Sequence, residues 1–255
     1  MDKLKELLDD EVKKRDSEDE LSLDKPDPLL IAKKYNDEYI SLICALFAYG
    51  NAKQIVKILL SFNFGILDEN ENVIRDSLKD SYYRFQNGED IISFFIAIKR
   101  LKKVSTLEDI FKIGYNKNNN VMDGIDSIIT NILQVYNYQS KGYKFLIGTI
   151  PKKDSKGNIK LIGNSAYKRY NMFLRWMVRS DNLDIGLWKD INKKDLILPL
   201  DTHTFQVSHK LGLVDRKTAD LKSATIITNK LKEFDLNDPI KYDFAIYRLG
   251  QENII

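Results

Sequence analysis

Apolar residues recur at helical spacing along almost the whole chain of 255 residues, and alternating apolar and polar runs are nearly absent. The first pattern is typical of amphipathic helices and the second of half-buried strands. The pattern predicts helices over residues 3–15, 29–35, 39–49, 52–62, 71–78, 90–103, 107–113, 122–136, 165–179, 222–234 and 240–249, and one more after residue 201. The sequence therefore predicts an all-α protein, with an irregular link and a small hairpin within 143–161.

The helix after Ser165 has two different faces. Its apolar stripe must face a core and consists of Ala166, Tyr170, Phe173, Leu174, Met177 and Val178. Lys168, Arg175 and Arg179 make the opposite face cationic, with Arg169 beside them. Ser165 is the expected N-cap, which places Lys168 in the first turn, where the positive end of the helix dipole disfavours a charged amine. Since a neutral amine is a nucleophile, Lys168 is a candidate catalytic residue.

Asp201 opens the next predicted helix. Pro199 favours extended backbone just before it, and Phe205 and Val207 give the following segment an apolar side. An aspartate in this position accepts a hydrogen bond from a first-turn N–H, and taken alone it is ordinarily only a cap. Taken with Lys168, it has a second interpretation.

Segments 161–168 and 200–203 together resemble the helix-hairpin-helix DNA glycosylase superfamily, which includes endonuclease III. In that family a Leu-Pro-Gly-Val-Gly-x-Lys hairpin supplies a nucleophilic lysine, and a Val-Asp-Thr-His segment supplies an acid/base aspartate. The corresponding residues here are LIGNSAYK, which ends at Lys168, and LDTH, which contains Asp201. This chain has one extra residue before the lysine, lacks the hairpin proline and replaces the second glycine. The separation of Lys168 from Asp201, 33 residues, is longer than in endonuclease III and looks closer to the archaeal 8-oxoguanine glycosylase branch. The helix from Lys168 to Arg179 resembles that of uncharacterised bacterial relatives without an iron–sulfur cluster.

The resemblance implies two helical lobes and a helix-hairpin-helix-like element at 161–179. One lobe is a multi-helix barrel over residues 39–195, and the other combines residues 1–38 with 196–255. A groove between them would hold double-stranded DNA with a damaged base, such as 8-oxoguanine, or an abasic site. Lys168 would form a Schiff base with the sugar and Asp201 would transfer protons, giving glycosylase and AP lyase activity.

The resemblance also implies DNA contacts. They are expected at Gly163, Asn164, Ser165, Arg169, Arg175, Arg179, Asn51 and His203. Asn51 follows Gly50 in the loop that would enter the gap left by the flipped base, although a glycine that simply ends a helix explains this loop equally well. His203 has a second expected role, which is to orient Asp201. Lysine clusters at 99–103 and 152–160 would form a phosphate track if they converge in space.

Composition excludes several other classes of protein. The single cysteine, Cys44, lies in an apolar run, so neither a disulfide framework nor a four-cysteine iron–sulfur cluster is expected. His203 and His209 lack the spacing of metal ligands, and we expect no metal and no cofactor. No apolar run reaches membrane-spanning length and the N-terminus is too charged for a signal peptide. We therefore expect a cytoplasmic monomer that does not bind membranes.

Two other functions remain compatible with the sequence. The net charge of +3 is too small to demand a nucleic acid partner. The altered hairpin favours a DNA-binding relative that has kept the fold without the chemistry. In the second alternative the chain is an all-α scaffold for protein interactions, and Lys168 is only the edge of a basic helix face.

Overall fold

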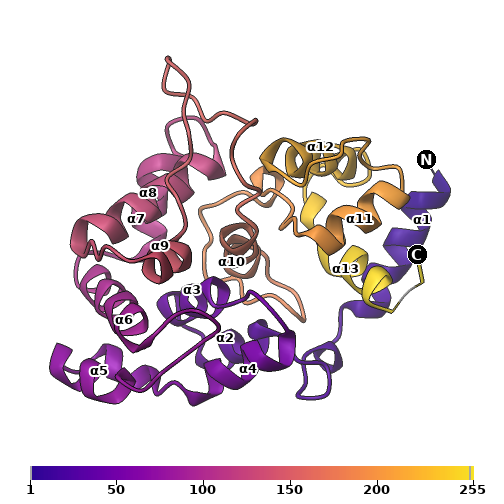
Figure 1. Ribbon diagram of the computed structural model, residues 1–255. Helices are drawn as coiled ribbons and strands as arrows, with labels where there is room; N and C mark the ends of the chain where they lie inside the picture. The colour runs from indigo at the N-terminus through magenta and orange to yellow at the C-terminus, as the bar shows by residue number, and fades with distance from the viewer. Residues whose placement is uncertain (1, 253) are drawn as a thin grey trace. The chain divides into compact units, whose positions relative to one another are not determined.

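The computed structural model describes residues 2–252 and 254–255, and in this part of the chain the protein is all-α. It contains thirteen α-helices and four short 3₁₀ helices, and β-pairing is limited to isolated bridges. The chain divides into two compact units (Figure 1). We call Pro26–Pro151 the middle unit, and Met1–Lys25 together with Lys152–Ile255 the terminal unit.

The middle unit contains eight α-helices. They are α2 (Pro28–Tyr35), α3 (Glu38–Leu46), α4 (Ala52–Ser61), α5 (Glu71–Leu78), α6 (Gly88–Lys102), α7 (Leu107–Tyr115), α8 (Val121–Val135) and α9 (Lys141–Ile147). Helix α6 is buried on nearly every side and packs against α5, α8 and α9. Helices α7 and α8 approach closely at two glycines, since a Cβ on Gly114 would lie 1.9 Å from the carbonyl oxygen of Asp123 and one on Gly124 would overlap the ring of Phe111.

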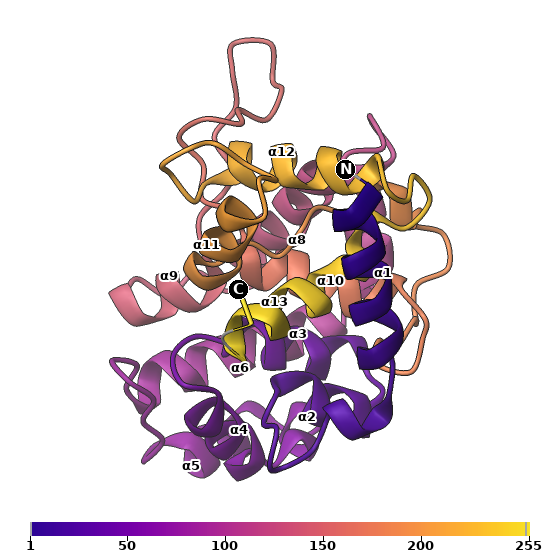
Figure 2. The same ribbon diagram turned by 90° about the vertical axis from the view of Figure 1, so that its right-hand side faces the viewer.

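The terminal unit contains the remaining five α-helices. They are α1 (Asp2–Arg15), α10 (Lys168–Val178), α11 (Thr202–Lys210), α12 (Leu221–Lys232) and α13 (Asp243–Gln251). Helix α1 packs along α13, as both views show, although the two lie at opposite ends of the sequence (Figure 2). Arg15 fixes this contact by donating to both carboxylate oxygens of Glu252, at 2.7 and 2.6 Å. Helix α1 and the C-terminal helix α13 therefore lie in contact within one unit.

Short polar side chains start most of these helices. Asp27, Asp37, Asn51, Asn70, Asn87, Thr106, Asn120, Ser140, Asp201 and Asp220 each accept a hydrogen bond from a backbone N–H in the first turn. Asn87 and Asp90 form a reciprocal capping box at α6. These caps explain why the helix starts lie close to the positions predicted from sequence.

The structure corrects several expectations about local structure. Helix α9 occupies the start of the link predicted to be irregular, and it ends at Gly148, whose φ of 83° stops the helix. The small hairpin within that link is present as a bridge between Lys153 and Ile159. The expected helix-hairpin-helix-like element at 161–179 is absent, because the described segment 148–167 before α10 contains no helix. Ser165 pairs with Asp220 in a bridge instead of capping α10.

The compact units also differ from the expected division of the chain. Residues 152–195, expected in the barrel that spans 39–195, belong to the terminal unit, and residues 26–38, expected with the C-terminal segment, belong to the middle unit. The reason is that α10 is tied by ion pairs to residues 184, 238 and 243, which lie in the same unit. The chain passes between units at Lys25 to Pro26 and at Pro151 to Lys152.

Candidate active site

Lys168 is the first residue of α10. The preceding Tyr167 adopts a left-handed backbone conformation, with φ of 48°, and turns the chain into the helix without a side-chain cap. Asn171 stabilises this turn, because its side-chain amide donates to the carbonyl of Ala166 at 2.9 Å. The turn therefore sets Lys168 at the helix start, although by a different device from the expected serine cap.

Asp201 is the N-cap of α11, as the sequence predicts. One of its carboxylate oxygens, Oδ1, accepts a hydrogen bond from the N–H of Thr204 at 2.8 Å. The segment before it is anchored where the N–H of Leu198 donates to Thr228 on α12 at 3.0 Å, with Leu198 and Leu200 buried. Asp201 is thus held by its own helix start and by the buried strand-like segment that leads to it.

The fold brings together Lys168 and Asp201, which are 33 positions apart in the sequence. Lys168 Nζ lies 3.8 Å from Asp201 Oδ2, the oxygen that does not cap the helix. The side chains are 31% and 34% exposed, so both can be reached from solvent. Lys168 is the first residue of α10 and Asp201 the N-cap of α11, so the N-terminal ends of two helices meet at this pair. An amine beside a carboxylate in such a setting is suited to nucleophilic attack assisted by a proton acceptor.

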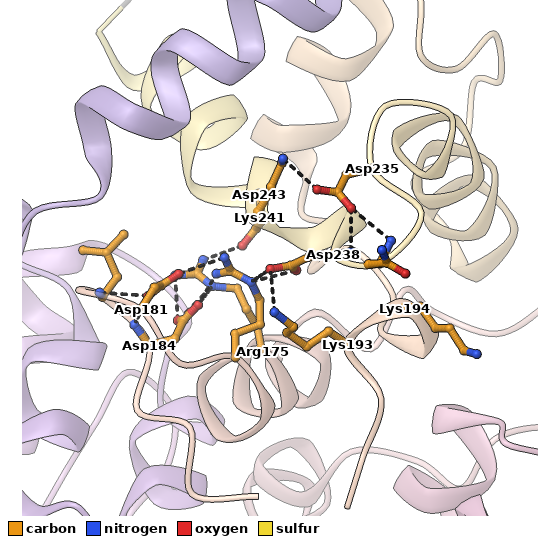
Figure 3. Close-up of polar contacts among 12 residues, drawn as sticks. Arg175, Asp181, Asp184, Lys193, Lys194, Asp235, Asp238, Lys241 and Asp243 are labelled. Carbon is orange, nitrogen blue, oxygen red and sulfur yellow. Dashed lines mark hydrogen bonds and ion pairs between the residues drawn. The ribbon is translucent and has the colours of Figure 1, made fainter. Parts of the chain in front are cut away.

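Arg175 and Arg179, expected to contact DNA, are instead buried. Their exposed fractions are 4% and 7%. Arg175 donates to Asp184 at 3.1 Å and to Asp243 at 2.6 Å, and Arg179 donates to Asp238 at 3.0 Å and also contacts Asp184. Figure 3 shows this charge cluster, in which Lys193 approaches Asp238 from the side. Both guanidinium groups are occupied inside the terminal unit, so the expectation that they form a cationic surface is wrong.

The charge cluster also reaches the candidate site. Burial raises the pKa of the Asp243 carboxyl above its ordinary value, while the charges of Arg175 and Lys168 act in the opposite direction. Burial alone would lower the pKa of Arg175, but Asp184 and Asp243 outweigh it and raise that pKa. Arg175 therefore remains charged, and Asp243 is a buried carboxyl within the electrostatic range of Lys168.

The hairpin residues have different environments. Gly163 is exposed, with φ of 85° and open space around its Cα. Asn164 is buried, and its side chain accepts from the N–H of Lys152 and donates to the carbonyls of Lys152 and Lys160, at 2.8, 3.0 and 2.7 Å. Ser165 is exposed. The side chain of Asn164 thus closes the loop 152–160 instead of facing solvent, contrary to the expected DNA contact.

The other residues expected to contact DNA differ in their exposure. Arg169 is half-buried. Asn51 is exposed in the middle unit, where its side chain caps α4 by accepting from the N–H of Lys53. His203 packs edge-on against Tyr247 of α13, with 6.1 Å between ring centroids, and its Nε2 is buried without a hydrogen-bond partner. Its imidazole therefore faces α13.

The two lysine clusters, at 99–103 and 152–160, also differ in their exposure. Lys99 is buried and donates to the carbonyl of Leu67 at 3.1 Å, so it contributes to folding and not to a surface track. Lys152, Lys156 and Lys160 are exposed along the loop 152–160, which stands out from the helices of the terminal unit (Figures 1 and 2). Only this second cluster is fully available to an anionic partner.

Sequence reasoning missed two residues beside the candidate site. Asn171 lies one turn after Lys168, and its buried Oδ1 has no hydrogen-bond partner. Asp243 lies far along the chain, and nothing in its local sequence marks it. Asn171 follows Lys168 by three residues, a spacing that places both on one side of a helix, so the sequence could have indicated it. Asp243 could be found only from the fold. Among residues 2–252 and 254–255 there is no group of three or more His, Cys, Asp or Glu side chains placed to hold a metal ion.

Comparisons with known proteins place the chain in a family. Across the described residues, none of the helices has both the length and the apolar character that crossing a membrane requires. Neither curated proteins nor solved structures gave a match. Residues 27–252, which include α2 to α13 and both Lys168 and Asp201, match a family described as "Protein of unknown function (DUF2400)". This match covers most of the sequence, and the chain belongs to that family.

Proposed function

We propose that this protein is a DNA glycosylase with AP lyase activity, in which Lys168 is the nucleophile and Asp201 the acid/base residue. The observation that carries the proposal is the 3.8 Å approach of Lys168 Nζ to the free oxygen of Asp201. Two segments that resemble the catalytic lysine and aspartate segments of one enzyme superfamily meet in space. Lys222 is also near the start of a helix capped by an aspartate, but no ion pair joins it to Asp220 among the described contacts.

The reaction follows from the chemistry of these two groups. A base is inaccessible inside a duplex, so the damaged nucleotide must first be flipped out. The Lys168 amine then attacks the sugar C1′, the bond from C1′ to the base breaks, and the base leaves with the bonding electrons. Asp201 accepts the proton that the attacking nitrogen loses and, as a carboxylate, stabilises positive charge that develops on the sugar. Ring opening yields an imine between Lys168 and C1′, from which loss of the 2′ proton eliminates the 3′ phosphate.

Trapping with borohydride tests the proposal directly, because borohydride reduces the imine to a stable amine that joins protein and DNA. The substrates are duplexes with an abasic site or with 8-oxoguanine. The parent protein should form the adduct, and Lys168→Ala should not. Lys222→Ala serves as the matched control and should trap like the parent, since it removes a lysine near another helix start of the same unit.

Asp201→Asn separates the chemical role of Asp201 from its structural one. Asparagine is as good an N-cap as aspartate, so α11 keeps its start. Loss of the carboxylate should still lower the trapping rate by at least about 100-fold, the lower end of what a general acid or base contributes. Unchanged trapping by Asp201→Asn would leave Asp201 as a cap only.

Absence of any adduct would point to one of the alternative functions. Duplex binding that weakens with rising salt, without an adduct, would favour the DNA-binding relative. The loop 152–160 supports DNA binding, since four exposed lysines lie along it. Absence of DNA binding at low salt would reject both DNA-related functions and favour the protein scaffold.

A further inference from the structure

A tight turn in the middle unit projects two side chains, Arg84 and Phe85. The flanking residues Tyr83 and Gln86 pair through their backbones in both directions, at 3.0 and 2.9 Å. Tyr83 and Gln86 are buried, whereas Phe85 is 51% exposed and Arg84 is also exposed. The turn therefore anchors its ends in the unit and presents its tip to solvent.

The ends of the turn are fixed by a chain of hydrogen bonds. The hydroxyl of Tyr83 donates to the backbone carbonyl of Tyr49 at 2.6 Å. The hydroxyl of Tyr49 donates to the side-chain oxygen of Gln86, and the amide of Gln86 donates to the carbonyl of Gly142 at 3.4 Å. These bonds join the segment after α3, the turn and α9, so both ends of the turn are fixed to the rest of the middle unit.

The backbone of Arg84 adopts a conformation that glycine and asparagine take more readily than arginine does. Its φ is 58°, in the left-handed region, which costs an arginine about 1–2 kcal/mol. Glycine or asparagine would fit with less strain. Gly50 leaves room for the arginine, because a Cβ on Gly50 would lie 2.4 Å from a guanidinium nitrogen of Arg84. Strain retained in a turn with an exposed side chain is typical of binding sites.

An aromatic surface adjoins the tip. It consists of Tyr49, Phe85 and Phe145, whose rings contact one another. The ring of Phe145 lies 4.8 Å from those of both Phe85 and Tyr49. Phe145 is 41% exposed and Tyr82 is more exposed still. Large apolar rings gathered on a surface indicate that something else packs on them.

The turn also borders an open groove of about 400 Å³. Its lining includes Gln54, Lys57, Ser61, Tyr82 and Arg84, and no carboxylate is among its lining residues. Lys57 and Arg84 are exposed, so they give the groove a positive charge. Lysine is depleted in protein interfaces, whereas cations beside exposed rings suit a strand of phosphates and bases.

We propose that the aromatic surface and this groove bind an unpaired stretch of a DNA strand. Bases would stack on Phe85, Phe145 and Tyr82, and Arg84 and Lys57 would contact the phosphates. Stacking requires no particular sequence because every base has a flat face. The identification of the strand as DNA rests on the proposed function, but the binding surface itself does not involve Lys168.

Fluorescence anisotropy with a labelled oligothymidine tests this inference on the full chain. Phe85→Ala and Phe145→Ala should each weaken binding by about 5-fold or more, the lower end for loss of one stacked base. Arg84→Gln should reduce the dependence of log affinity on log salt by about 0.7, as expected for one phosphate contact on a single strand. Tyr35→Ala is the matched control, because Tyr35 is also 41% exposed in the middle unit, and its affinity should not change.

A second variant separates stacking from folding. Phe85→Leu keeps an apolar side chain against Phe145 but removes the ring, and it should weaken binding with an unchanged circular dichroism spectrum. Parent-like affinity in Phe85→Ala, Phe85→Leu and Phe145→Ala would overturn the inference, as would absence of oligothymidine binding by the parent protein.

The outcomes also distinguish this inference from the proposed function. Lys168→Ala should bind oligothymidine like the parent protein. Weaker binding by the Phe85 variants, with no borohydride adduct on any duplex, would support the binding surface and reject the glycosylase. A borohydride adduct, together with parent-like oligothymidine binding by the Phe85 variants, would support the glycosylase and reject the binding surface.

Discussion

Arg175→Met should strongly destabilise the terminal unit, because it removes the cation that two buried carboxylates share. Asp184 retains Arg179, but Asp243 loses the guanidinium that donates to it at 2.6 Å. Breaking a buried ion pair by removing one partner typically costs about 3–5 kcal/mol. Methionine fills similar space, so the cost should arise from charge more than from a cavity.

The structure also sets an upper limit to this cost and its dependence on pH. Asp243 can escape the penalty by taking up a proton, which costs about 1.4 kcal/mol for each pH unit above its ordinary pKa of 3.8. The part of the cost that comes from the unpaired Asp243 carboxylate is therefore at most about 4 kcal/mol at pH 7 and about 2 kcal/mol at pH 5. The sign follows from proton binding: the folded variant keeps this proton while the unfolded chain releases it, so the variant loses stability as pH rises.

Urea unfolding followed by tryptophan fluorescence measures this effect. Both tryptophans, Trp176 and Trp188, are buried in the terminal unit, so the signal reports on that unit. Arg216→Met is the control, since Arg216 forms a partly exposed pair with Asp220 and its loss should cost about 1 kcal/mol or less. The double variant Arg175→Met with Asp243→Asn should recover part of the lost stability. A cost below about 1 kcal/mol for Arg175→Met, or one that does not change between pH 5 and 7, would refute the reasoning.

Three further predictions concern stability. Gly114→Ala should lower the free energy of unfolding by about 3 kcal/mol in thermal unfolding followed by circular dichroism, because the added Cβ would overlap the carbonyl of Asp123. Gly65→Ala is the control and should cost much less, because its Cβ would meet only a side chain, at 3.1 Å. Asp201→Ala should lower the stability measured by tryptophan fluorescence by about 1 kcal/mol through loss of the α11 cap, and equal stability of the alanine and asparagine variants would contradict this. Glu20 is buried, which alone raises its pKa, but Lys25 and two arginines outweigh burial and lower it. Its contribution is therefore fully present above pH 4.5 and lost as pH falls through the lowered pKa, and Glu20→Gln should flatten the acid limb of an unfolding titration.

Local sequence was sufficient to predict most of the helices. The all-α class, the helix after residue 70 and the Asp201 cap followed from apolar spacing and from side chains that bond to the nearest N–H. Both signals depend on residues within one or two turns, so no tertiary contact is needed to recognise them. The same locality explains the failure at α10, where Ser165 looked like a cap but the left-handed Tyr167 makes the turn. Such a conformation in a tyrosine has no sequence signature.

The candidate pair was predicted from two separate segments, and only the tertiary structure decided that they meet. It also decided the environment of Arg175 and Arg179. Both looked like surface cations, because charged residues are rarely buried unless they are paired. Their partners at positions 184, 238 and 243 are separated from the helix along the chain, and folding brings them together. Spacing along one helix reveals which residues share a face, whereas the charge and burial of that face depend on what packs against it.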